Sequence, residues 1–132
     1  MMPRMGQRVG IDLTSVSAVS EAISAHGHRY LERVYTAGEL ADCGTDPARL
    51  AGRFAAKEAA IKVLRPAPGT ALPWRDIEVQ RQPDGHVELH LQGRAAARAE
   101  QQGLAGFAVS LSHEGGAACA VVLAEDRPAG ES

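Results

Sequence analysis

The alternation of hydrophobic and polar residues near the start of the chain predicts a β-strand. Val9, Ile11 and Leu13 fall on one side of this strand, and Gly10 and Asp12 fall on the other. The apolar side is expected to face the core. Asp12 is therefore expected to point away from the core-facing residues, near the end of the strand.

Helical patterns follow this strand. Thr36 and Glu39 fit a capping box at the start of a short helix. Asp46 is a suitable N-cap, and Pro47 a suitable first residue, for a long helix that runs to about Leu64. Further helix signals are Val16, Val19 and Ile23 behind a cap at Thr14 or Ser15, then Tyr30, Leu31 and Val34 beyond Gly27, and residues 94–102 before Gly103.

Strand patterns dominate the second half of the chain. Residues 74–82 and 86–91 flank a Pro-Asp-Gly segment, which is a hairpin signal. Two more strands are expected from Phe107 and from Ala117. Because these strands follow one another as hairpins, without crossover helices, the sequence predicts an α+β fold. The sequence contains no G-x-x-x-x-G-K-[ST] loop, so a doubly wound nucleotide-binding fold is not expected.

Length and composition limit the possible classes of protein. The chain has 132 residues, and we expect one domain over residues 1–125 followed by a flexible tail over residues 126–132. A net charge of −2 argues against a general nucleic-acid-binding protein. No run approaches the ~20 apolar residues of a membrane span, and the first residues lack the apolar part of a signal peptide. We expect a cytoplasmic protein that makes no membrane contact.

The cysteines and most histidines follow no metal-binding pattern. Cys43 and Cys119 are isolated in the sequence, so both are expected to be free thiols, with Cys119 in the core. Structural or surface roles are expected for four histidines, which follow no zinc-ligand spacing: His26, His28, His86 and His90.

The long helix carries charged residues around its apolar face. At about 100° per residue, its apolar stripe consists of Leu50, Phe54, Ile61 and Leu64. Lys57 falls inside this stripe, with Arg53 on one flank and Glu58 and Lys62 on the other. Such a rim of charges predicts a polar site of phosphate or metal size. The alternative is a surface helix in which Glu58 pairs with Lys62 while Arg53 and Lys57 extend into water.

Five sequence blocks occur in an order that resembles one known family. The most specific is Arg53-Phe54-Ala55-Ala56-Lys57-Glu58-Ala59, with its Phe-x-x-Lys-Glu-Ala core. The others are Gly10-Ile11-Asp12, Arg33-Val34-Tyr35-Thr36 with Glu39, Trp74-Arg75-Asp76-Ile77-Glu78-Val79, and Ser110-Leu111-Ser112-His113-Glu114. Together they resemble the holo-acyl-carrier-protein synthase family, the small single-domain 4'-phosphopantetheinyl transferases. The resemblance implies an antiparallel sheet packed on one long helix and on shorter helices.

The resemblance also implies a reaction and a site. Members transfer 4'-phosphopantetheine from coenzyme A to a serine hydroxyl of an acyl carrier protein, of fatty-acid or polyketide type, and release 3',5'-ADP. Asp12 and Glu58 match the carboxylates that hold Mg²⁺, which prefers hard oxygen ligands. The implied catalytic residues are Asp12, Glu58, Lys62 and His113, and the implied cofactor contacts are Arg53, Lys57, Lys62, Ser112 and His113.

Family members of this size are homotrimers whose sites are shared between neighbouring subunits. Two alanine-rich helix faces would permit the close approach of another element: Ala51, Ala55 and Ala59 on one helix, and Ala95 and Ala99 on another. Ordinary packing within the chain is the alternative for these faces. Carrier recognition departs from the family pattern, because Ala18 stands where the first helix usually bears an arginine.

Other interpretations stay open at this point. Asp12 would otherwise cap the helix that follows it. His113, Glu58 and a water on the metal are the candidates for accepting the serine proton. The chain would otherwise be a non-catalytic carrier-protein or nucleotide-binding module, or a magnesium phosphotransferase that acts on another nucleotide. The presence of Asp12, Glu58 and Lys62 together favours catalysis.

Overall fold

The computed structural model describes residues 6–126, which fold around one long helix. The elements in chain order are β1 (Gln7–Ser15), α1 (Val16–His26), α2 (His28–Val34), α3 (Ala37–Cys43), α4 (Pro47–Leu64), the 3₁₀ turn η1 (Trp74–Asp76), β2 (Ile77–Arg81), β3 (Val87–Leu91), α5 (Gly93–Gln101), β4 (Leu104–Glu114) and β5 (Ala117–Asp126). The fold is α+β, as predicted. The predicted tail began at Asp126, but this residue is the last of β5, and the rest of the predicted tail, residues 127–132, lies outside the described residues.

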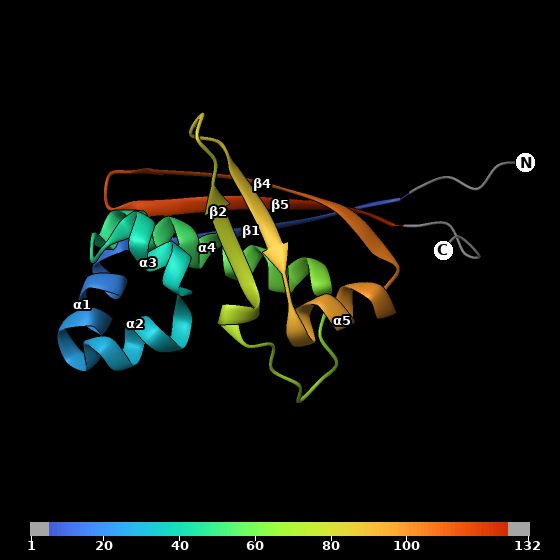
Figure 1. The fold of residues 1–132 in the computed structure, drawn as a ribbon, viewed down its shortest axis with the longest axis horizontal. Coiled ribbons are helices and arrows are strands. Elements are labelled where there is room, and N and C mark those ends of the chain that lie inside the picture. The colour runs from blue at the N-terminus through green and yellow to red at the C-terminus, as the bar shows by residue number, and fades with distance from the viewer. Residues whose placement is uncertain (1–5, 127–132) are drawn as a thin grey trace, which may run out of the picture.

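Two antiparallel sheets enclose α4 (Figure 1). Strands β1, β5 and β4 form a three-stranded sheet in the order β1-β5-β4, and β2 pairs with β3 as a hairpin. Helix α4 packs on the three-stranded sheet and also contacts β2. Helices α1, α2 and α3 gather at one end of the molecule, and α5 lies at the other (Figure 1). The sequence predicted one antiparallel sheet, and the structure divides its strands between two.

The predicted helix starts are confirmed. Ser15 caps α1 by accepting a hydrogen bond from the Ala18 amide at 3.3 Å. Thr36 and Glu39 form the capping box of α3, and Asp46 caps α4 with Pro47 in its first turn. These local signals placed α4 correctly, and α4 carries most of the candidate site.

The hairpin begins later than predicted. Residues 74–76 form η1 instead of extended strand, because the Asp76 amide donates back to the Pro73 carbonyl at 3.1 Å. The side chain of Asp76 then accepts a hydrogen bond from the Arg94 amide at the start of α5. This turn brings Trp74 beside α4, whereas an extended strand would have placed Trp74 further along the sheet.

The faces of β1 are the reverse of the prediction. Val9, Ile11 and Leu13 are 67%, 58% and 73% exposed, whereas Gly10 is buried against α4. A Cβ atom at Gly10 would lie only 2.2 Å from the Ala59 carbonyl oxygen. The strand therefore contacts the helix backbone directly, through the residue without a side chain. Period-2 alternation identified the strand, but the need for this close approach decided which face turns inward.

The central strand β5 also turns small residues toward α4. Its small residues Ala118, Ala120 and Ala124 are buried against α4, as is Val122. Cys119 points to the opposite face and is only partly buried, so its predicted place in the core is wrong.

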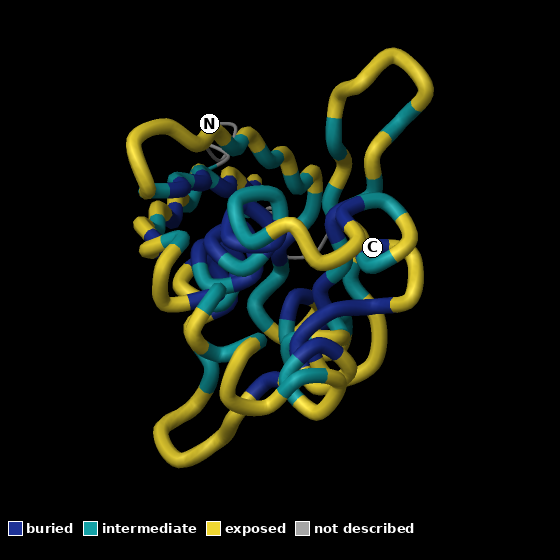
Figure 2. The backbone as a smooth tube through the Cα atoms, turned by 90° about the vertical axis from the view of Figure 1, so that its left-hand side faces the viewer, coloured by how far each residue is buried: buried dark blue, intermediate teal, exposed yellow. Residues whose placement is uncertain are grey.

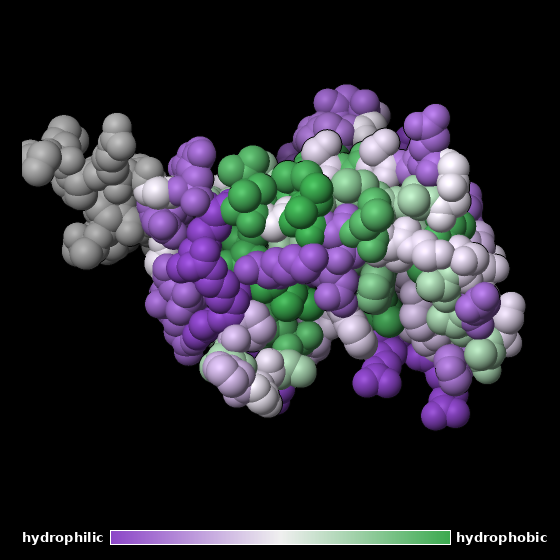
Figure 3. All heavy atoms as spheres, turned by 180° about the vertical axis from the view of Figure 1, so that it is seen from behind, coloured by the Kyte–Doolittle hydropathy of each residue, from purple (hydrophilic) through white to green (hydrophobic). Residues whose placement is uncertain are grey.

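The outer face of the three-stranded sheet is apolar. Val9, Ile11, Leu13 and Leu123 are the exposed large hydrophobic residues in the described part of the chain. In register, Val9 pairs with Leu123, Ile11 with Val121 and Leu13 with Cys119. Figure 3 shows apolar side chains gathered on the face seen from behind the view of Figure 1. We call the row Val9, Ile11, Leu13 and Leu123 the outer apolar face.

Helix α4 is the centre of the core. Figure 2 shows the buried residues concentrated on this helix, with exposed loops around it. Both alanine-rich faces are buried inside the chain's own core: Ala51, Ala55, Ala59, Ala95 and Ala99. The packing alternative is therefore correct for these residues, and they are not a surface for another subunit. Across residues 6–126, every helix is too short or too polar to cross a bilayer.

We predict that Gly10→Ala lowers the free energy of unfolding by about 1–3 kcal/mol, because the new Cβ atom must push β1 away from α4. Gly52→Ala is the matched control. Its Cβ atom would meet the end of the Leu111 side chain at 3.2 Å, and alanine favours the helix by about 1 kcal/mol. Urea unfolding followed by circular dichroism measures both. Equal stability of the two variants would contradict the close-approach argument.

Candidate active site

Asp12 and Lys62 meet where β1 passes over α4. The Lys62 Nζ atom lies 3.3 Å from Asp12 Oδ1 and donates a hydrogen bond to the Ile11 carbonyl oxygen at 2.7 Å. Asp12 Oδ2 accepts a hydrogen bond from Thr14 Oγ1 at 3.0 Å. Ser15, and not Asp12, caps α1. The structure thus brings Asp12 and Lys62 together and removes the capping alternative for Asp12.

Glu58 lies one turn before Lys62 but has a different partner. Its Oε1 atom accepts a hydrogen bond from Trp74 Nε1 at 2.8 Å. Within residues 6–126, no ion pair joins Glu58 to Lys62, because the ammonium group of Lys62 reaches β1 instead. Glu58 is partly exposed and lines a cleft of about 510 Å³ with Arg33, Trp74 and Arg94. The surface-pair alternative for Glu58 and Lys62 is therefore wrong.

A second cleft, of about 490 Å³, is lined by basic residues from four elements or their connecting turns. Arg49 and Arg53 come from α4, Arg81 from the end of β2, and His113 from the end of β4. We call this the arginine cleft. Arg53 and His113, both predicted as cofactor contacts, are brought together here. Ser112 does not line this cleft, because it faces the outer side of the sheet beside Cys119.

One carboxylate holds the arginines of this cleft. Asp42 on α3 forms an ion pair with Arg53, and it lies 3.4 Å from Arg49 and 3.7 Å from Arg81. The Arg53 side chain is buried, yet its Nε atom has no hydrogen-bond partner. A single carboxylate opposite three guanidinium groups leaves the cleft with a positive charge. An anion is the ligand that such a cleft would bind.

His86, at the tip of the β2–β3 hairpin, is a further basic residue of this cleft, and its ring lies between the carboxylates of Asp84 and Glu88. It lines the arginine cleft, and its Nε2 atom lies 2.9 Å from Glu88 Oε2. Hydrogen bonds to Glu88 and Asp84 raise the pKa of His86 above its ordinary value. The protonated form is therefore favoured to a higher pH than in an isolated histidine. The spacing of His86 in the sequence indicated only a structural or surface role.

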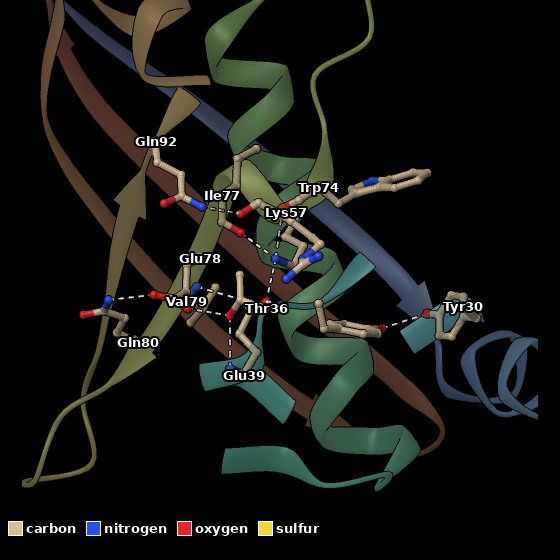
Figure 4. Close-up of polar contacts among 12 residues, drawn as sticks. Tyr30, Thr36, Glu39, Lys57, Trp74, Ile77, Glu78, Val79, Gln80 and Gln92 are labelled. Atoms are coloured by element: carbon tan, nitrogen blue, oxygen red, sulfur yellow. Dashed lines mark hydrogen bonds and ion pairs between the residues drawn. The ribbon is translucent and has the colours of Figure 1, made fainter. Parts of the chain in front are cut away.

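Lys57 requires a correction, because its predicted contact with the cofactor is wrong. The side chain is completely buried, and its Nζ atom lies 2.7 Å from Glu39 Oε1 (Figure 4). It also donates hydrogen bonds to the carbonyl oxygens of Trp74, at 3.1 Å, and Ile77. Burial lowers the pKa of Lys57, and the charge of Glu39 opposes this shift. All three ammonium protons are used inside the core, so none is left for a ligand.

Glu39 completes this buried network. Its two carboxylate oxygens accept the backbone amides of Thr36 and Val79, each at 2.9 Å, in addition to the ammonium group of Lys57. The pair therefore joins α3, α4 and β2 (Figure 4). The helical pattern placed Lys57 on the buried face correctly, but the partner comes from a helix that only the tertiary fold brings near.

Five of the predicted site residues thus fall into two groups within one chain, whereas Lys57 lies in the core and Ser112 on the outer side of the sheet. Asp12, Glu58 and Lys62 lie along one side of α4, and none of them lines the arginine cleft. Arg53 and His113 lie in that cleft, on another side of the helix. Sequence reasoning missed Asp42, Arg49 and Arg81. The four-residue spacing of Arg49 and Arg53 was a usable signal for Arg49. Arg81, in contrast, reaches the cleft only through the long-range packing of the hairpin.

Comparison with known proteins identifies this arrangement. A model of the 4'-phosphopantetheinyl transferase superfamily matches residues 8–122. The holo-[acyl-carrier-protein] synthase of Herpetosiphon aurantiacus is 39% identical over 120 residues, which cover 86% of this chain and 94% of that protein. The chain belongs to the holo-acyl-carrier-protein synthase family.

Solved structures of this family share the fold. The coenzyme A complex from Chronobacterium ammoniagenes has a TM-score of 0.82 and 32% identity, covering 93% of this chain and 99% of that one. The Helicobacter pylori holo-[acyl-carrier-protein] synthase in complex with coenzyme A has a TM-score of 0.78 and 28% identity, covering 87% and 97%. The predicted fold, family and enzyme class are confirmed.

We predict that Lys57→Met lowers the free energy of unfolding by about 3–5 kcal/mol, because the carboxylate of Glu39 would stay buried without its countercharge. The double variant Lys57→Met with Glu39→Gln removes that charge and should recover part of the loss. Thermal and urea unfolding of both single variants and of the double variant measures this coupling. Additive losses would contradict a direct ion pair.

Proposed function

We propose that this enzyme transfers the 4'-phosphopantetheine group of coenzyme A to a serine hydroxyl of an apo acyl carrier protein. The products are the holo carrier and 3',5'-ADP. Support comes from the curated relative called holo-[acyl-carrier-protein] synthase and from two similar structures that hold coenzyme A. The observation in this chain that carries the proposal is the arginine cleft on the same helix as a carboxylate and lysine group.

The arginine cleft suits the phosphate groups of coenzyme A. Phosphate oxygens accept paired hydrogen bonds from guanidinium groups, and the Nε atom of Arg53 is buried without a partner. Arg49 and Arg81 would supply further positive charge on either side. We assign His113 to cofactor binding, and not to proton transfer, because it lines the cleft with the arginines, and neither Asp12 nor Glu58 lines that cleft.

Asp12 and Glu58 fit a magnesium ion by the chemistry of their donor atoms. Mg²⁺ binds hard oxygens and commonly uses one or two carboxylates, with substrate phosphates and water completing its ligands. When bound, Mg²⁺ would neutralise charge on the pyrophosphate during displacement at phosphorus. Lys62, 3.3 Å from Asp12, would orient this carboxylate and place a positive charge beside the same phosphates.

We propose a homotrimer in which each active site is shared by two subunits. Within one chain, the arginine cleft and the Asp12–Glu58 pair lie on different sides of α4, so one subunit does not present them together. The outer apolar face gives a surface for the contact, since Ile11 and Leu13 are more than half exposed in the single chain. The arginine cleft of one subunit would then serve the carboxylates of its neighbour.

We predict that Asp12→Asn and Glu58→Gln each reduce transfer by about 10²–10³-fold, because each removes a charge from the proposed metal site without changing side-chain size. The assay is mass spectrometry of a panel of apo carrier proteins after incubation with coenzyme A and Mg²⁺, looking for one added phosphopantetheine group. Circular dichroism checks the fold. Unchanged turnover with unchanged Mg²⁺ dependence would refute the metal assignment, and coenzyme A binding without any transfer would favour a binding module.

We predict that Ile11→Asp converts the trimer into single subunits and abolishes transfer, because it places a charge in the middle of the outer apolar face. Ala97→Asp, on the exposed side of α5, is the control and should leave both properties intact. Light scattering at micromolar concentration, with the transfer assay on the same samples, measures the effect. A fully active single subunit would rule out the shared site.

A further inference from the structure

Trp74 forms a direct link between the buried network and Glu58. It is the only tryptophan in the chain. Its indole Nε1–H group donates to Glu58 Oε1 at 2.8 Å. Its backbone carbonyl oxygen accepts a hydrogen bond from Lys57 Nζ at 3.1 Å. Lys57 thus holds the main chain of Trp74, and the side chain of Trp74 holds the carboxylate of Glu58.

The position of the indole ring is fixed on several sides. Lys57 donates to the carbonyl oxygens of both Trp74 and Ile77, which bracket the turn η1 (Figure 4). The ring centroid of Phe54 lies 6.0 Å from that of Trp74, and the guanidinium carbon of Arg33 lies 5.8 Å from the Trp74 ring. Figure 4 shows the indole ring directed away from the ammonium group that holds its main chain.

We propose that Trp74 is a positioning residue for Glu58, one that selects which carboxylate oxygen faces the metal. This inference rests on the proposed metal site. By occupying Oε1, the indole leaves Oε2 as the oxygen available to Mg²⁺. Carboxylates that bind metals are themselves commonly held by hydrogen bonds, and losing such a partner typically weakens metal binding by about 10–100-fold.

Glu58 needs such a partner because its surroundings offer competing ones. A partly exposed glutamate has several rotatable bonds, and ordering them costs free energy. Lys62 lies four residues later on the same helix, and Arg33 lines the same cleft as Glu58. A rigid neutral donor orients the carboxylate without cancelling its charge. An ion pair with either cation would reduce the negative charge offered to Mg²⁺.

Two substitutions separate the hydrogen bond from the ring. Trp74→Phe removes the N–H group and part of the ring. Because the chain has a single tryptophan, biosynthetic replacement by the benzothienyl analogue, with sulfur in place of N–H, removes the donor and keeps the shape. Phe54→Leu is the control, because it removes a ring contact of Trp74 but keeps the hydrogen bond.

The first measurement is calorimetric titration of Mg²⁺ into each protein with coenzyme A present at saturation. We expect about 10–100-fold weaker Mg²⁺ binding in Trp74→Phe and in the analogue protein, with coenzyme A affinity changed by less than about twofold. Phe54→Leu should bind Mg²⁺ like the wild type. Unchanged Mg²⁺ binding in the analogue protein would overturn the proposal. Tighter Mg²⁺ binding would also overturn it, because it would show that the indole keeps Glu58 from the metal.

The second measurement needs no metal. The single indole N–H gives one cross-peak in a nitrogen-15 NMR spectrum, and Glu58→Gln should shift it while Asp12→Asn should not. An unmoved peak in Glu58→Gln would overturn the proposal. Failure of the proposed metal site and failure of the positioning role give different results. If the wild type binds Mg²⁺ no better than Asp12→Asn, the metal site itself is wrong. If Asp12→Asn weakens Mg²⁺ binding but the indole variants do not, only the positioning role is wrong.

Discussion

The ion pair between Lys57 and Glu39 is the interaction on which the rest of the site depends. Both side chains are completely removed from solvent, which is costly unless every hydrogen-bonding position is used. Here the ammonium group has three oxygen partners, and the carboxylate also accepts two backbone amides. Replacing the pair by apolar residues could keep the volume, but it would release η1 and the start of β2. The pair therefore fixes geometry more than it adds stability.

The second constraint is the contact between β1 and α4 at Gly10. Without a side chain there, the strand lies against the helix backbone, and the neighbouring side chains on that face fall directly over α4. This places Asp12 within reach of Lys62. It also turns Val9, Ile11 and Leu13 outward, because successive residues of a strand alternate between its faces. One glycine thus brings a proposed metal ligand to the helix and exposes an apolar face.

Sequence predicted those parts of the structure that depend on neighbouring residues. The caps at Ser15, Thr36 and Asp46 are local, and so is the position of Lys57 on the buried face of its helix. The inward face of β1 was not predictable from alternation, because hydrophobicity pointed one way and the close approach at Gly10 required the other. Arg81 was missed for a similar reason, since only the packing of the hairpin against α4 brings it to the cleft.

The motif on α4 explains why one helix carries residues of both candidate sites. Arg53 and Glu58 are five residues apart, so their side chains point about 140° from each other around the helix axis. Side chains in these directions cannot converge on one small ligand from the same helix. Lys57 points between them and is used for the core. The block from Arg53 to Glu58 therefore carries an arginine of the cleft, a buried lysine and a carboxylate at different angles around one helix, which agrees with the proposed completion of the site by a neighbouring copy.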